Sequence, residues 1–154
     1  MKKSREVTYS HPLVKVVEGL MVLPENKGRD LSQLKSVGTV LGFAPCPYLD
    51  LINRGQLRIL ENASFQGLLL QVLKRQLDGV YINTVVADNI LADVLKTPKG
   101  LVYDRNLPHT ESNFSLSTIR HEKTIQKFNS FLLQEKALVN NLREKYKISD
   151  PNLQ

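Results

Sequence analysis

The chain has 154 residues, enough for one domain or slightly more, and a domain of this size buries about two thirds of its unfolded surface. Hydrophobic residues make up 42% of it and charged residues 23%, a composition that is typical of globular proteins and excludes a disordered chain. The net charge is +6, but the basic residues are scattered. Nucleic-acid binding would require a basic stripe with stacking aromatic residues, so we expect no nucleic-acid partner.

The first half of the chain alternates short apolar runs with polar turns. The first apolar run, at 13–23, predicts an extended strand that is broken at Glu18-Gly19. Asp30 is expected to cap the helical turn at 30–35 that follows this strand. Gly55 is expected to end a short helix. The predicted elements are strands at 13–23, 37–41 and 57–60, a helical turn at 30–35, a turn at 42–47 and a helix at 48–54.

The second half has longer helices. Ser64 is expected to cap a helix whose apolar residues recur at helical spacing, and two C-terminal helices are expected to meet near Gln134-Glu135. The predicted elements are helices at 65–76 and 84–95, strands at 79–82, 101–103 and 114–118, two helices within 120–146 and a loose tail after Ile148. Because strands and helices alternate with short connections, the sequence predicts a doubly wound, mostly parallel α/β sheet with two C-terminal helices.

One block of the sequence indicates where a ligand would bind. Leu73 to Thr84 contains the end of a helix, an Asp78-Gly79 turn, a short apolar strand, and an Asn83-Thr84 pair that opens the next helix. The polar pair therefore follows the carboxyl end of a buried strand, and ligands of open α/β sheets bind at that end.

Metal, disulfide and membrane-span signals are absent from the sequence. Cys46 is the only cysteine, and its spacing from His11, His109 and His121 matches no metal site, so we expect no metal and no cofactor. No apolar run approaches the roughly 20 residues of a membrane span. The first ten residues lack the apolar stretch of a signal peptide, so either the protein is not secreted or the sequence begins after its targeting segment.

Several motifs, taken in order, resemble the second half of the type II periplasmic solute-binding proteins, above all the amino-acid-binding family of ABC importers. Arg5-Glu-Val-Thr-Tyr-Ser-His-Pro12 is similar to the segment that leads from the first lobe into the second. Asp30-Leu-Ser-Gln-Leu-Lys-Ser-Val-Gly-Thr-Val-Leu-Gly42 is similar to the phrase before the ligand loop. Leu77-Asp-Gly-Val-Tyr-Ile-Asn83 is similar to the strand that ends on a ligand-binding Asp. The segment from Phe128 to Tyr146 is similar to the family's closing helices.

The resemblance implies a second lobe that lacks the first, located in the periplasm. The divisions it implies are crossover strands at 1–24, an α/β ligand-binding lobe at 25–112, a returning strand and C-terminal helices at 113–148, and a loose tail at 149–154. The implied partners are a small polar solute and the membrane subunits of an importer. The implied ligand contacts come from the loop residues Gly42, Phe43 and Ala44 and from the side chains of Asn83 and Thr84.

Each of these residues also has a structural interpretation. Asn83 and Thr84 could simply cap the following helix, Gly42 could serve a turn that needs a positive φ, and Phe43 could fill the core. Tyr48 and Tyr81 are expected to be packing residues. Where amino-acid binders have an Asp, this chain has Asn83, which carries no charge, and the loop after Gly42 contains two prolines without N–H donors.

Two functions of different class follow. The first is extracytoplasmic binding of a small polar solute by an importer receptor or ligand sensor. The second is a structural or interaction remnant of such a protein that no longer binds solute. With either function we expect a homodimer, because C-terminal helices without a first lobe would expose a large apolar face. Glu61, Asp88 and Asp93 form no recognisable catalytic constellation, so we expect no enzyme activity.

Overall fold

The computed structural model describes residues 6–148, which form two compact units. Val17–Thr110 form one unit, called here the α/β unit. Residues 6–16 and 111–148 form the other, called here the terminal unit. The expected loose tail at 149–154, like residues 1–5, lies outside the described residues.

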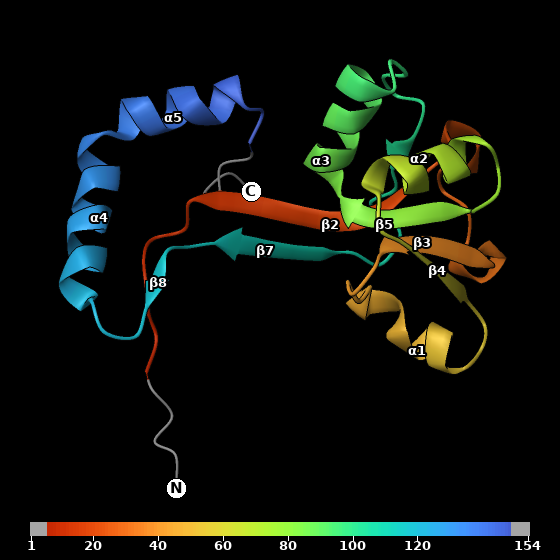
Figure 1. The fold of residues 1–154 in the computed structure, drawn as a ribbon, viewed down its shortest axis with the longest axis horizontal. Helices are drawn as coiled ribbons and strands as arrows, with labels where there is room; N and C mark the ends of the chain where they lie inside the picture. Colours follow the sequence, from red (N-terminus) through yellow and green to blue (C-terminus); the bar gives the residue numbers. More distant parts are fainter. Residues whose placement is uncertain (1–5, 149–154) are drawn as a thin grey trace, which may run out of the picture. The chain divides into compact units, whose positions relative to one another are not determined.

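A mixed sheet forms the centre of the α/β unit (Figure 1), with the strand order β4-β3-β5-β2-β6. The strands are β2 (Val14–Val22), β3 (Ser36–Val40), β4 (Arg58–Asn62), β5 (Gly79–Asn83), β6 (Val102–Tyr103) and β7 (Thr110–Phe114), which pairs with β2 off this path. β3 is parallel to β4 and β5, and β2 is antiparallel to β5 and β6. Along this path β2 alone is reversed, which confirms the prediction of a mostly parallel sheet.

Helices cover both faces of this sheet, as a doubly wound fold requires. They are α1 (Leu49–Asn53), α2 (Phe65–Leu73) and α3 (Thr84–Asn89), which continues as a π-helical turn over Ile90–Val94. One core packs α2 and α3 against one face, and it contains Leu68, Leu69, Val72, Ala87, Leu91, Met21, Val80 and Ile82. The other core lies with α1 on the opposite face, and it contains Leu20, Val22, Leu34, Val37, Tyr48, Leu57, Tyr81 and Leu107.

The predicted caps are confirmed. The Asp30 carboxylate accepts the N–H of Ser32 at 2.8 Å, within a capping box that opens a short 3₁₀ helix over Leu31–Gln33. The Ser64 hydroxyl accepts the N–H of Gly67 at 3.2 Å and caps α2. Gly55 follows α1 with a φ of +68°, a conformation that favours glycine.

The predicted break in the first strand at Glu18-Gly19 is wrong. β2 runs without interruption, and both residues pair with β5, Glu18 opposite Asn83 and Gly19 opposite Ile82. The glycine has a packing reason, since a Cβ at this position would collide with the ring of Tyr103. The absent side chain therefore makes room for a neighbouring strand and does not end its own.

The terminal unit combines a two-stranded sheet with two helices. Its elements are β1 (Thr8–Tyr9), β8 (Ser117–Thr118), α4 (Glu122–Gln134) and α5 (Lys136–Lys145). The helices meet at Glu135, as predicted. The predicted strand at 114–118 is split in two, because the chain leaves β7 at Phe114 and then pairs with β1, where Ser10 and Leu116 exchange hydrogen bonds.

The first segment of the chain is tied to both C-terminal helices. The N–H of His11 donates to the amide oxygen of Asn129 in α4 at 2.8 Å. The Arg143 guanidinium in α5 donates to the carbonyl of Leu13 from Nε at 3.1 Å and from Nη2 at 2.8 Å. No helix within residues 6–148 is both long enough and apolar enough to cross a membrane.

Candidate functional site

The predicted site residues meet at one edge of the α/β sheet. β3 and β5 are parallel and in register, with Val37 opposite Gly79, so their carboxyl ends lie side by side. Gly42 and Phe43 follow β3, and Asn83 is the last residue of β5. We call this edge the carboxyl edge.

A tight turn presents the Phe43 side chain. The N–H of Phe43 donates to the carbonyl of Val40 at 2.9 Å, and Gly42 has a φ of +81° at the third turn position, as in a type II turn. The Thr39 hydroxyl donates to the Phe43 carbonyl at 3.0 Å and closes the loop from the strand side. The interpretation of Gly42 as a residue needed for a positive φ is confirmed.

The loop uses its backbone donors within the protein. The N–H of Gly42 donates to the Glu61 carboxylate at 3.2 Å, and that of Phe43 is bonded within the turn. Pro45 and Pro47 carry no N–H. The segment that follows β3 therefore offers few donors to a bound anion, and it already holds one carboxylate of the chain itself.

Three aromatic rings continue from this turn into the core. The Phe43 ring stacks on Tyr81 with centroids 6.3 Å apart, and Tyr48 meets Tyr81 edge-on at 5.7 Å. Tyr48 and Tyr81 are fully buried, and their hydroxyls donate at 2.9 Å to the Pro108 carbonyl and the Thr110 hydroxyl, respectively. Phe43 is 39% exposed. The prediction that the two tyrosines are packing residues is confirmed, and Phe43 is the ring of this stack that faces solvent.

Asn83 caps α3. Its amide oxygen accepts the N–H of Val86 at 3.1 Å, so the capping interpretation is confirmed. Because the oxygen is used in the cap, the group left for other partners is the NH₂ donor. Thr84 is the first residue of α3 and is half-buried.

Glu18 also belongs to the carboxyl edge, although it was not predicted from the sequence as a ligand contact. It is paired directly with Asn83 across β2 and β5, so the two side chains share one face of the sheet, the face that contains Leu20 and Tyr81. Burial raises the pKa of Glu18. Burial also raises the pKa of Tyr81, and the nearby Glu18 charge raises it further. The signal was present in the alternation of Val16, Glu18 and Leu20, which places a carboxylate in a buried apolar series.

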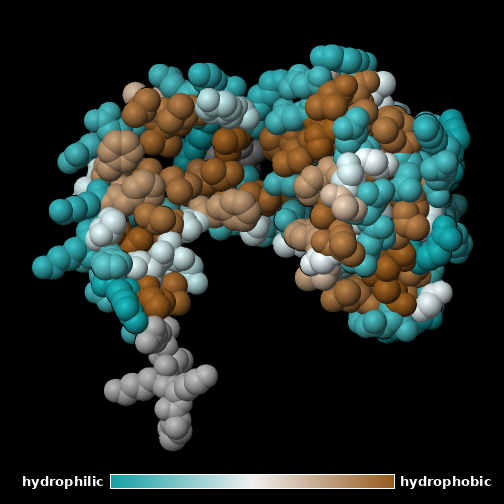
Figure 2. Space-filling model, in the orientation of Figure 1, coloured by the Kyte–Doolittle hydropathy of each residue, from teal (hydrophilic) through white to brown (hydrophobic). Residues whose placement is uncertain are grey.

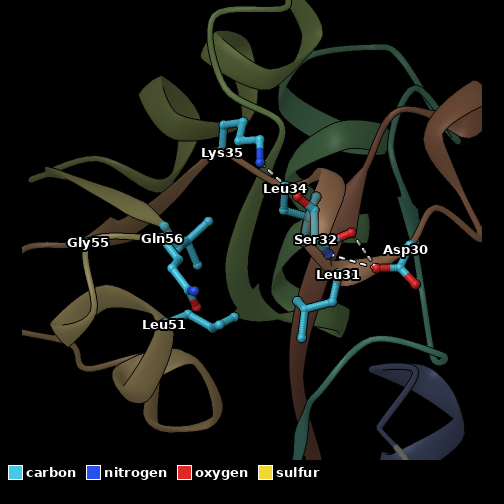
Figure 3. Close-up of a pocket in the computed structure, with 9 residues that line it drawn as sticks. Asp30, Leu31, Ser32, Leu34, Lys35, Leu51, Gly55 and Gln56 are labelled. Carbon is cyan, nitrogen blue, oxygen red and sulfur yellow. Dashed lines mark hydrogen bonds between the residues drawn. The ribbon is translucent and has the colours of Figure 1, made fainter.

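A hollow lies at the opposite edge of the sheet, before β3 and β4 (Figure 3). It has a volume of about 690 Å³ and is lined by Asp30, Leu31, Ser32, Leu34, Lys35, Leu51, Gly55, Gln56 and Leu57. Its charged groups stabilise the hollow's own wall, since Asp30 accepts from Ser32, and the Lys35 ammonium donates to the Ser32 carbonyl at 2.8 Å. The residues predicted from the sequence to bind a ligand lie at the carboxyl edge and not here.

Disulfide and metal chemistry have little support in the described part of the chain. Cys46 is a free, exposed cysteine. Among residues 6–148, no group of three or more His, Cys, Asp or Glu side chains could hold a metal ion.

Comparison with solved structures finds several proteins of similar fold. An ancestral arginine-binding protein bound to arginine matches with a TM-score of 0.66 at 20% identity, over 95% of this chain and 67% of that one. The ancestral amino acid-binding protein AncCDT-1, a precursor of cyclohexadienyl dehydratase, matches with a TM-score of 0.63 at 16% identity, over 92% and 62%. A mutant of ArgBP from T. maritima matches with a TM-score of 0.60 at 16% identity, over 91% and 61%.

These likenesses concern the fold. No protein-family model matches the chain, and a search of curated proteins finds no match either. The chain spans about three fifths to two thirds of the length of these solved proteins. The chain therefore has the α/β fold of these solved binding proteins, over part of their length.

Proposed function

We propose that the α/β unit binds a small polar solute at its carboxyl edge, as the ligand-contacting lobe of an extracytoplasmic importer receptor or ligand sensor. The observation that carries the proposal is the meeting of the exposed Phe43 ring, the Asn83 amide and the Glu18 carboxylate at the sheet edge where ligands of α/β proteins bind. Gly42 shapes the turn that presents Phe43. Ala44, which follows Phe43, and Thr84, which follows Asn83, are the further proposed contacts.

The solved proteins of the same fold support this proposal through their names, which describe binding of arginine or amino acids. We extend to this chain a periplasmic location, the membrane subunits of an importer as partners, and a binding role without catalysis. The strands β2 and β7 both pass from one unit into the other.

The test is a thermal-shift screen of amino acids, amines, organic acids and sugars at ~10 mM each. A ligand at a hundred times its Kd adds about 2.7 kcal/mol to the free energy of unfolding, which raises Tm by several degrees in a domain of this size. Phe43→Ala should abolish the shift, because it removes the exposed ring. A panel without any shift would refute solute binding by this chain.

A matched pair of variants separates binding from stability. Asn83→Leu and Ser64→Ala each remove a helix cap, at a cost of about 1 kcal/mol, but only the first lies at the carboxyl edge. Both variants should have a lower Tm, and only Asn83→Leu should lose the ligand-induced shift. Equal ligand responses in the two variants would place the binding site elsewhere.

A second candidate function rests on the apolar surface of the terminal unit. Figure 2 shows apolar side chains gathered over the part of the chain that contains α4 and α5. The exposed apolar residues there are Phe131, Leu133, Leu138, Leu142 and Tyr146. We propose that this surface forms a homodimer, which would be the whole function of a remnant that no longer binds solute.

Light scattering after size-exclusion chromatography tests the dimer. Leu133→Glu should shift the mass toward that of a monomer, because Leu133 is 69% exposed and a charge there would be buried at the interface. A dimer together with a flat ligand panel would favour the remnant, and a monomeric parent protein would refute the dimer.

A further inference from the structure

We propose that the solute bound at the carboxyl edge carries a cationic group, an ammonium or a guanidinium, that lies against the Glu18 carboxylate and the face of the Phe43 ring. This inference rests on the proposed function and adds the charge class of the solute to it.

The first step is that the turn after β3 offers few donors to an anion. A bound carboxylate or phosphate is usually held by backbone N–H groups at the turn after a strand. Here the Gly42 N–H is bonded to Glu61, the Phe43 N–H is bonded within the turn, and Pro45 and Pro47 have none. An anionic ligand would have to displace the Glu61 carboxylate or lie beside it.

The second step is the position of Glu18. The register places its side chain beside Asn83 and diagonally across from Tyr81, on the face that the aromatic stack covers. The residue is half-buried, so an ionised carboxylate has lost part of its hydration. A cation at this position would restore the lost interaction, and within the described residues no salt bridge to Glu18 is formed.

The third step is the ring beside it. Phe43 and Glu18 both adjoin Tyr81, the first by stacking at 6.3 Å and the second by its diagonal position in the sheet. The negative face of an aromatic ring attracts a cation, and a carboxylate beside the ring adds to the attraction. Asn83 contributes no charge to this group.

The fourth step is the distribution of charge along the strands. Lys35 and Arg58 lie at the amino ends of β3 and β4, whereas Glu61 and Glu18 lie near the carboxyl edge. The protein as a whole carries a net charge of +6. The net positive charge of the protein repels cations, whereas the local negative group at the carboxyl edge attracts them. A cation is therefore attracted to this edge in preference to the rest of the surface.

The experiment is isothermal titration of the full chain with solutes matched in shape and different in charge. Choline and its neutral isostere 3,3-dimethyl-1-butanol form one pair, and agmatine, L-arginine, glutarate and glucose complete the set. We expect binding within the cationic class, and we expect added salt to weaken it. Glu18→Gln should weaken that binding by about tenfold or more, because it removes the charge and keeps the shape.

The control is Glu144→Gln, which removes an exposed carboxylate from α5 in the terminal unit and should leave the Kd unchanged. Binding of glutarate or glucose that is lost in Phe43→Ala but unchanged in Glu18→Gln would overturn the charge class while leaving the proposed function in place. Equal binding of choline and its neutral isostere would overturn it as well. The absence of binding by every solute would refute the proposed function itself.

Discussion

Replacement of Gly42 by alanine should change both the stability of the protein and its binding. Gly42 has a φ of +81°, and a Cβ built there meets no atom within 4 Å. The cost is therefore conformational and not steric, about 1–2 kcal/mol for an L residue in the left-handed region. The smaller entropy of the unfolded alanine chain returns about 0.4–1 kcal/mol. The net loss expected for Gly42→Ala is roughly 1 kcal/mol of unfolding free energy.

Gly55 provides the matched control for this substitution. Its φ is +68°, and a Cβ there also meets nothing within 4 Å, but it lies after α1, among the residues that line the opposite hollow. Urea denaturation should show a similar loss for Gly42→Ala and Gly55→Ala. Titration with a bound solute should show weaker binding only for Gly42→Ala, because the turn aims the Phe43 ring. A Gly42→Ala protein as stable as the parent would refute the turn described here.

Three further predictions concern the sheet and its core. Gly19→Ala should lower the free energy of unfolding by about 1–3 kcal/mol by overpacking, and Tyr103→Ala should remove most of that additional loss in a double-mutant cycle; additive losses would refute the contact. Leu69→Ala, in the fully buried core under α2, should cost about 2–5 kcal/mol in urea denaturation, and a loss under 1 kcal/mol would contradict that burial. Since burial raises the pKa of Glu18 above 4.5, its stabilising contribution is complete below that value and is lost as the pH rises through the folded-state pKa. Glu18→Gln should therefore match or exceed the parent at pH 7, by under about 1 kcal/mol, with the difference disappearing toward pH 4; a larger advantage in acid would reverse the sign of this argument.

The sequence predicted the features that local chemistry determines. Asp30 and Ser64 cap helices because their own side chains reach the first N–H groups, and the signal lies within three residues. The junction of α4 and α5 at Glu135 and the positive φ of Gly42 are local in the same sense. The alternation of elements was enough to predict the fold class.

Features that depend on distant pairing could not be predicted in this way. Gly19 looked like a strand breaker because nothing near it in sequence shows that the Tyr103 ring occupies the space beside it. Glu18 became a candidate ligand contact only when the register placed it opposite Asn83, far along the chain. The bond between the Gly42 N–H and Glu61 has the same origin, since β3 and β4 must pair before the carboxylate can reach the turn.

The division of the chain has a consequence for the order of folding. The α/β unit is one continuous segment, whereas the terminal unit is assembled from both ends of the chain. Its tie between Leu13 and Arg143 closes a loop that contains the whole α/β unit. An unfolded loop of that length is entropically costly to close, and folding of the α/β unit shortens it. During synthesis the α/β unit can therefore fold while α4 and α5 are still to be made, and the terminal unit forms last.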